Sequence, residues 1–201
     1  MLADIILWLP PILFAITIHE VAHGLMADYQ GDPTAKYAGR LTLNPLPHID
    51  PIGFIALVIF HIGWAKPVPV NPAMFKNPRR GILLVSLAGP VSNILLAIAS
   101  SLLFRLFMLL VTTPNPVVRT IVLMLRISVE INLILAFFNL IPIPPLDGSK
   151  VLFNLMNVSA EGQLRLERIG PLLLIFVIFT GGIRFLIFPL VNLFRGILIG
   201  I

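Results

Sequence analysis

Residues 5–27 read IILWLPPILFAITIHEVAHGLMA, an apolar run broken only by two prolines and by His19, Glu20 and His23. A helix needs about 20 apolar residues to cross a hydrocarbon core of about 30 Å, so this run is long enough to span a membrane. Ionisable side chains inside such a helix are costly and mark a candidate functional site. This stretch therefore predicts a membrane protein whose chemistry begins in its first helix.

The composition of the whole chain supports a membrane protein. Of 201 residues, 58% are hydrophobic and 11% are charged, and the mean hydropathy is +1.00. Soluble domains carry about 25% charged residues, so the composition excludes an ordinary soluble domain, a disordered chain and a fibrous repeat. We expect an all-α polytopic membrane bundle in which residues 1–201 form a single domain.

Three further apolar runs are long enough to cross a membrane, at 81–111, 117–141 and 170–201. The run at 51–64 is too short to span the bilayer, and its length favours a re-entrant or β-like element between the first two long helices. Residues 170–201 form either one span with a terminal surface helix or two short spans. In total we expect four to six membrane helices.

The basic residues indicate how the bundle is oriented. The net charge is +5, but the Lys and Arg residues are scattered between apolar runs, which speaks against nucleic-acid binding. Loops 28–80 and 148–169 carry Lys and Arg, whereas the turn 112–118 carries none. Basic loops stay in the cytoplasm, so both loops are expected there and the turn outside. The segment 51–64 must then enter and leave on the same side.

Residues 19–23 form an H-E-x-x-H motif. Positions i and i+4 share one face of a helix, so His19 and His23 can bind one metal ion. Glu20 is adjacent and can act as a general base on water. The alternative is a pair of histidines satisfied by hydrogen bonds between helices. The chain has no cysteine, so any metal site must be built from His, Asp or Glu.

A catalytic zinc ion usually has a third protein ligand. The candidates are Asp147, His48, His61, Asp50 and Glu130. Helices 5–27 and 117–141 both run from outside to inside, so Asp147 emerges at a depth similar to that of the histidines. It also follows a proline-broken helix end, where irregular backbone is tolerated if it lines a polar cavity. Topology therefore favours Asp147.

Three motifs together resemble the site-2 proteases, a family of intramembrane zinc metalloproteases. They are HEVAHG at 19–24, AGPVSN at 88–93 and FNLIPIPPLDG at 138–148, and they occur in the family's order. The stretch GWAKPVPVNP at 63–72 resembles the short prokaryotic branch. The sequence shows no PDZ or CBS regulatory domain.

The resemblance implies a function and a set of site residues. It implies one zinc ion bound by His19, His23 and Asp147, with Glu20 as the catalytic acid/base. Asn93 and Asn139 would hold the substrate backbone or the site itself. The resemblance covers the core at 5–168, which precedes the hydrophobic segment 170–201. It further implies a transmembrane protein substrate, a lipid bilayer of the prokaryotic cytoplasmic membrane, and an active site near the cytoplasmic side.

Two other functions use similar residues. A metal-ion transporter would also place His and Asp in the membrane, but transporters tend to contain inverted repeats, and none is visible here. An inactive scaffold that binds helices would not need Glu20 beside two ligands. The spacing also predicts an ion pair between Arg126 and Glu130, and Arg105 is expected to reach the outer membrane interface.

Overall fold

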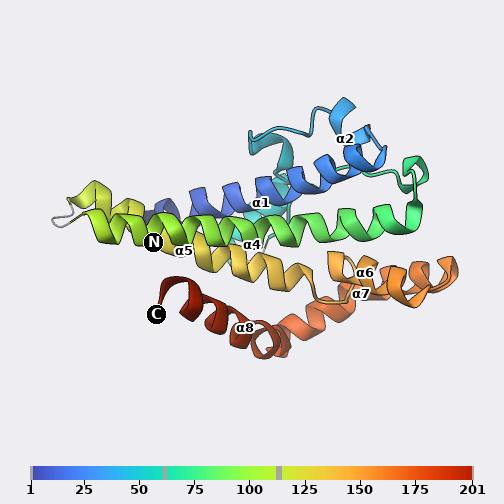
Figure 1. Ribbon diagram of the computed structural model, residues 1–201. Helices are drawn as coiled ribbons and strands as arrows, with labels where there is room; N and C mark the ends of the chain where they lie inside the picture. Colours follow the sequence, from blue (N-terminus) through green and yellow to red (C-terminus); the bar gives the residue numbers. More distant parts are fainter. Residues whose placement is uncertain (1, 61–62, 112–114, 201) are drawn as a thin grey trace.

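A computed structural model describes residues 2–60, 63–111 and 115–200. The described residues are almost entirely helical (Figure 1). The elements are α1 (Leu2–Gln30), α2 (Thr34–Tyr37), η1 (Leu46–His48), α3 (Pro51–Phe60), η2 (Pro72–Met74), α4 (Pro78–Leu110), α5 (Pro116–Asn139), α6 (Asp147–Met156), α7 (Ala160–Phe179) and α8 (Gly182–Ile199). The expected all-α class is confirmed.

Four of these helices are long and apolar enough to cross a membrane, namely Ile6–Gln30 within α1, α4, α5 and α8. This number is the lower limit of the expected range. The run at 170–201 is divided by a break at Gly181, whose φ of +77° suits glycine. The second part is the spanning helix α8, and the first part is the apolar end of α7.

The two central helices begin with the same local signal. Asn77 precedes α4 and Asn115 precedes α5, and each is followed by proline. The Asn77 side chain accepts a hydrogen bond from the Arg80 backbone N–H at 3.0 Å, and Asn115 accepts one from Val118 at 2.9 Å. Asparagine caps unpaired N–H groups at a helix start, and proline fits the first turn, so each pair sets where its helix begins.

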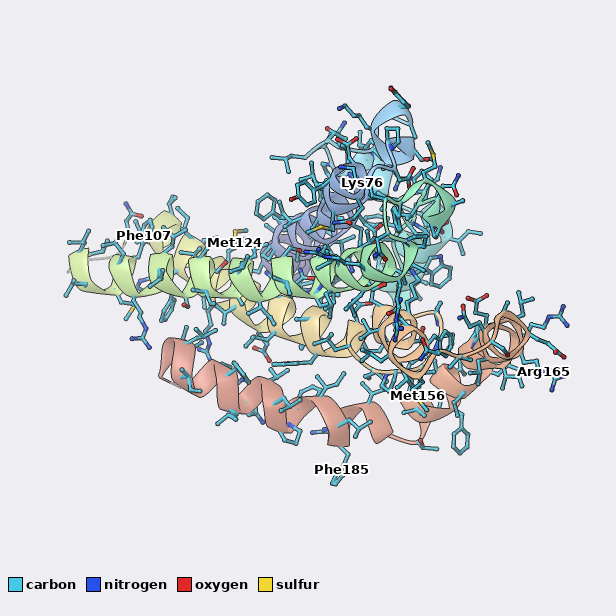
Figure 2. The ribbon with its side chains drawn as sticks, turned by 45° about the vertical axis from the view of Figure 1, so that its right-hand side comes forward. Lys76, Phe107, Met124, Met156, Arg165 and Phe185 are labelled. Carbon is cyan, nitrogen blue, oxygen red and sulfur yellow. The ribbon has the colours of Figure 1, made fainter. Side chains whose placement is uncertain are left out.

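The bundle has α1, α4 and α5 side by side, with α8 along the opposite side of α5 (Figure 1). A buried apolar cluster joins α4, α5 and α8 and includes Leu133, Ile187 and Val191. In contrast, Phe185 on α8 points away from the bundle (Figure 2) and is 82% exposed. An apolar side chain that faces outward from a spanning helix suits contact with lipid.

The short segment between the first two long helices returns to its starting side. Helix α3 has ten residues and is about 15 Å long, half the thickness of the hydrocarbon core. Ile49 before it and Ala65 after it form an antiparallel bridge, and the Lys66 N–H donates to the His48 carbonyl at 2.9 Å. The element is thus a short helix whose flanks pair as one β-bridge, which combines the two expected forms.

One expectation about charged residues is wrong in the described part of the chain. Glu130 pairs with Arg195 of α8 at 3.7 Å rather than with Arg126. The place of Arg105 at the outer membrane interface stays a prediction. Its guanidinium donates to the Leu198 and Ile197 carbonyls at 2.7 and 2.9 Å, so it caps the end of α8. Helix α8 comes from the far end of the chain, and local spacing along α4 or α5 cannot reveal it.

We predict that Ile187→Ala destabilises the protein by about 2–5 kcal/mol, because Ile187 is 2% exposed and its truncation leaves a cavity. Thermal unfolding in detergent measures this change. Phe185→Ala on the same helix is the control and should unfold close to the parent, since its ring packs on little protein. Equal losses for both variants would contradict the packing of α8 described above.

Candidate metal centre

The two histidines of α1 bring their ring nitrogens together. His19 and His23 lie one turn apart, and their Nε2 atoms are separated by 3.0 Å. The rings meet edge to face, with centroids 4.6 Å apart. Both side chains are buried. The i, i+4 spacing of the sequence thus produces the shared face that a metal site needs.

Asp147, the first residue of α6, reaches the same point from the other side of the bundle. Its Oδ2 atom lies 3.2 Å from His19 Nε2 and 3.1 Å from His23 Nε2. The following residue makes this approach possible, because a Cβ atom at Gly148 would lie 2.2 Å from the Leu140 carbonyl oxygen. Glycine lets α6 begin directly against the end of α5, and this turn aims the carboxylate inward.

The outer nitrogens of both rings are already used. His19 Nδ1 donates to Asn93 Oδ1 at 2.6 Å, and His23 Nδ1 donates to the Val85 carbonyl at 2.7 Å. A neutral imidazole with Nδ1 protonated has its lone pair on Nε2. Both Nε2 lone pairs therefore face each other and the Asp147 carboxylate. Acceptor atoms this close repel one another unless a proton or a metal cation lies among them.

These three donor atoms fit a zinc ion. In a tetrahedral site with bonds of about 2.0–2.1 Å, neighbouring ligand atoms lie about 3.3 Å apart. The observed separations are 3.0–3.2 Å. Within the described ranges, His19, His23 and Asp147 are the one group of His, Asp or Glu residues with this closeness. Two histidines and one carboxylate are also a common ligand set for catalytic zinc.

Gly89 of α4 makes room for the centre. A Cβ atom at this position would lie 2.4 Å from His23 Nε2 and 2.6 Å from His19 Nε2. Such contacts are far below van der Waals distance, so any larger residue would displace the imidazoles. The glycine of the AGPVSN motif is thus required for a steric reason, because the α4 backbone lies immediately against the Nε2 atoms of His19 and His23.

The carboxylate has the charge that a metal ligand requires. Burial alone raises the pKa of Asp147, but in the metal-free site a proton carried on Nε2 of His19 or His23 is shared with the carboxylate, which outweighs burial and lowers that pKa. Asp147 is therefore an anion at neutral pH. The Lys150 ammonium lies 3.8 Å from its other oxygen, Oδ1, at the exposed side of the site.

Glu20 is held by a segment that follows α3. Its Oε2 atom accepts a hydrogen bond from the Val68 backbone N–H at 2.8 Å, and both residues are buried. Val68 belongs to residues 65–71, a stretch without helix. The proposed general base is thus oriented by a backbone amide of the KPVPV sequence.

Two buried charges anchor segment 65–71. The Arg40 guanidinium donates to the Lys66 carbonyl at 2.6 Å and to the Pro67 carbonyl at 3.3 Å. Asp32 Oδ2 accepts from the Asn71 N–H at 2.6 Å, and its other oxygen accepts from the Thr34 hydroxyl. Burial raises the pKa of Asp32, but these hydrogen bonds outweigh it and hold the pKa below its ordinary value. The segment is fixed at both ends.

A cavity of about 470 Å³ lies over the centre. His19, His23, Asp147 and Glu20 line it, together with Pro67, Val68 and Val70 of segment 65–71. Its apolar walls come from α4, α6 and η2 with their flanks, and its polar rim carries Lys150, Gln163 and Glu167. The volume is that of a small-molecule site and accommodates a few residues of an unwound peptide.

The other candidates for the third ligand have different partners. His48 Nε2 donates to the Thr42 carbonyl at 3.0 Å. Asp50 caps α3 by accepting from the Gly53 N–H at 2.8 Å. Glu130 pairs with α8, as described above, and His61 lies outside the described residues. The structure brings none of the described alternatives into the centre.

The two asparagines occupy different places. Asn139 lines the cavity, and its Nδ2 atom donates to the Leu135 carbonyl at 3.0 Å. Asn93 is fully buried, and its amide bonds His19, Ala15 and Asn132. Of the two roles considered for this pair, support of the site suits Asn93 and contact with substrate suits Asn139.

Several contacts of the centre have no signal in the sequence. The Val85 carbonyl and the Val68 N–H are backbone groups, so residue types do not reveal them. Asn132 could have been noticed as an amide inside an apolar helix, where polar side chains pair with one another. The sequence does not show that it pairs with Asn93.

Comparison with known proteins places this chain in a family. The profile of Peptidase family M50 matches residues 108–181. YwhC of Bacillus subtilis, which is named as a zinc metalloprotease, is 37% identical over 186 residues, covering 90% of this chain and 84% of the relative. The chain belongs to peptidase family M50. The resemblance to site-2 proteases is confirmed, and this M50 protein is a membrane zinc metalloprotease.

Two further relatives are also named as zinc metalloproteases. Rip2 of Mycolicibacterium smegmatis is 28% identical over 187 residues, covering 90% of this chain and 70% of its own length. MJ0611 of Methanocaldococcus jannaschii is 40% identical over 139 residues, covering 67% of this chain and 62% of its own length. No solved structure matches the M50 chain at a comparable level of significance.

We predict that Gly89→Ala lowers zinc binding at least tenfold, because its Cβ atom would collide with both Nε2 atoms. Metal analysis of the purified protein after dialysis against a chelator measures the loss. Gly196→Ala on α8 is the matched control, since a Cβ atom there meets nothing within 4 Å. Full zinc occupancy in Gly89→Ala would show that the α4 backbone does not lie against the centre.

We predict that Asp32→Ala loosens segment 65–71. Hydrogen bonds to a charged group contribute about 1.5–3 kcal/mol, so amide exchange at Asn71 should speed up about 10- to 100-fold. Hydrogen exchange measures this rate. Because the pKa of Asp32 is lowered, the parent keeps the anchor at neutral pH and loses it only as the pH falls below the ordinary value of 3.8.

Asp28→Ala is the matched control for this experiment. Its carboxylate pairs with Lys36 at 3.5 Å, and among the described residues no hydrogen bond joins it to segment 65–71. Exchange at Asn71 should stay at the parent rate. If Asp32→Ala also left that rate unchanged, the anchoring role of Asp32 would be refuted.

Proposed function

We propose that this M50 protein is an intramembrane endopeptidase, which hydrolyses a peptide bond in or near a transmembrane helix of another membrane protein. The observation that carries the proposal is the position of the site. His19 and His23 lie inside the spanning stretch Ile6–Gln30, and the cavity above them is bordered by the long helices α1 and α4. A substrate that reaches this depth is itself a membrane segment.

We assign His19, His23 and Asp147 as the zinc ligands. Their donor atoms converge, their outer nitrogens are hydrogen-bonded, and Gly89 leaves space beside them. Bound zinc supplies Lewis-acid catalysis of peptide hydrolysis. Residues 1–201 then act as one metalloprotease domain, in which the helices around the centre hold its ligands.

Glu20 is the proposed general acid/base. It is adjacent in sequence to His19, lines the cavity, and is oriented by the Val68 N–H. Its carboxylate takes a proton from the attacking water and passes it to the leaving amine. Burial among apolar walls limits access of other water to the reacting bond.

The substrate must unwind before it can be cut, because a helix engages its carbonyls in its own hydrogen bonds. Segment 65–71 is not helical and lies beside Glu20. An extended substrate can pair with its backbone as an additional β-strand. Asn139, which lines the same cavity, offers an amide to a freed backbone group. These two features support binding of an unwound peptide next to the base.

We further propose that the site opens toward the cytoplasm. The end of the bundle that carries α2, the start of α4 and α6 holds the basic stretches of the chain, including Lys36, Arg79, Arg80 and Lys150. In Figure 2, Arg165 of α7 lies at this same end. Basic segments favour the cytoplasmic side of a membrane such as the prokaryotic cytoplasmic membrane.

We predict that Glu20→Gln keeps zinc and lowers cleavage of a model transmembrane substrate by about 10²–10⁴-fold, the usual contribution of a general base. Purified protein in lipid vesicles with zinc provides the assay, and metal analysis provides the second readout. Asp147→Ala should lose both zinc and cleavage. Equal cleavage by Glu20→Gln and the parent would exclude the proposed role of Glu20.

The substrate class has its own test. A soluble peptide with the same scissile sequence is offered beside the transmembrane substrate. We expect cleavage of the membrane-inserted substrate to exceed that of the soluble peptide. Rapid cleavage of the soluble peptide alone would overturn intramembrane proteolysis and leave the metalloprotease assignment intact.

A further inference from the structure

A chain of buried hydrogen bonds connects the metal centre to the middle of α5. His19 Nδ1 bonds Asn93 Oδ1 at 2.6 Å, and Asn93 Nδ2 bonds Asn132 Oδ1 at 2.8 Å. Asn132 Nδ2 then bonds the Ser128 carbonyl at 2.8 Å and its hydroxyl at 3.3 Å. The hydroxyls of Ser128 and Ser100 meet at 2.9 Å. Both asparagines have no exposed surface.

This chain has a direction. A backbone carbonyl can only accept, so the Ser128 carbonyl requires the NH₂ end of the Asn132 amide. The oxygen of Asn132 must then face Asn93. Asn93 in turn has two acceptors for its NH₂ group, Asn132 Oδ1 and the Ala15 carbonyl at 3.2 Å. Its oxygen is left to face His19.

We propose that Asn132 is a positioning residue of the metal centre, which fixes the Asn93 amide and thereby the ring nitrogen that His19 presents to zinc. With Asn93 Oδ1 against it, Nδ1 of His19 must donate, and Nε2 is left with its lone pair. A rotated Asn93 amide would offer N–H groups instead, and the proton of His19 would belong on Nε2. That tautomer cannot bind the metal through Nε2.

The surroundings make this control effective. Asn93 and Asn132 are fully buried between α1, α4 and α5. Bulk water therefore does not replace a hydrogen-bond partner that a substitution removes. Without Asn132, only the longer contact to the Ala15 carbonyl would hold the Asn93 amide in place. The inference rests on the proposed assignment of His19 as a ligand, and it concerns affinity for zinc before any substrate binds.

The test compares zinc affinities of the full-length protein, measured by competition with a chromogenic chelator. Asn132→Leu removes the acceptor for Asn93 at similar size, and we expect zinc binding to weaken about tenfold or more, as for other groups that orient metal ligands. Asn132→Asp is neutral in this fully buried site, because burial disfavours the charged carboxylate. Its OH group can donate to the Ser128 carbonyl while its other oxygen accepts from Asn93, so zinc binding should stay within about threefold of the parent.

Ser100→Ala is the matched control. It also removes a buried hydrogen bond between α4 and α5, but it leaves the bond from Asn132 to the Ser128 carbonyl intact. It should bind zinc like the parent. Where Asn132→Leu does not fold, Asn132→Ser replaces it, because the hydroxyl is too short to reach Asn93. Parent-like zinc affinity in the folded Leu or Ser variant would overturn the proposal.

A double-mutant cycle separates positioning from a general loss of stability. In a His19→Ala background, the hydrogen-bonded chain from Asn132 through Asn93 no longer ends on a metal ligand. Asn132→Leu should therefore not weaken zinc binding further. An additive loss in that background would show that Asn132 acts through the fold alone and would refute its positioning role. If His19→Ala by itself kept the parent affinity, the metal-site assignment would fail instead.

Discussion

Three acceptor atoms gathered within an apolar bundle are the constraint on which the structure of this protein depends. The Nε2 atoms of His19 and His23 and the Oδ2 atom of Asp147 lie 3.0–3.2 Å apart. Their mutual repulsion is relieved when a proton or a metal cation lies among them. Two glycines make room for these three atoms. Gly148 lets α6 begin against the end of α5, and Gly89 keeps α4 from filling the space beside the imidazoles.

Much of the centre could be predicted because its residues follow helix periodicity. The i, i+4 spacing of His19 and His23 places two rings on one face regardless of tertiary structure. Predicting Asp147 as the third ligand required one further inference, namely that residues 51–64 do not span the membrane. Helix α3 and the bridge between Ile49 and Ala65 agree with that inference, because they bring the chain back where it started.

What could not be predicted depends on contacts between distant segments. The ion pair of Glu130 follows from the docking of α8, which the spacing of α5 does not encode. The orientation of Glu20 depends on the Val68 N–H, and that amide is in place because buried Arg40 and Asp32 hold segment 65–71. A sequence shows that such residues exist, but not which backbone atoms they reach.

The polarity of the hydrogen-bonded chain from α5 to the centre has its origin in helix geometry. In α5 the Ser128 carbonyl points toward the following turn, where Asn132 stands at i+4. That backbone group has no alternative but to accept, and each amide after it is oriented in turn until His19 is reached. Soluble enzymes often orient a ligand histidine with a carboxylate. In an apolar bundle, neutral amides achieve the same selection without adding a buried charge, which would be expensive there. The backbone of one spanning helix thus specifies the protonation of a ring carried by another.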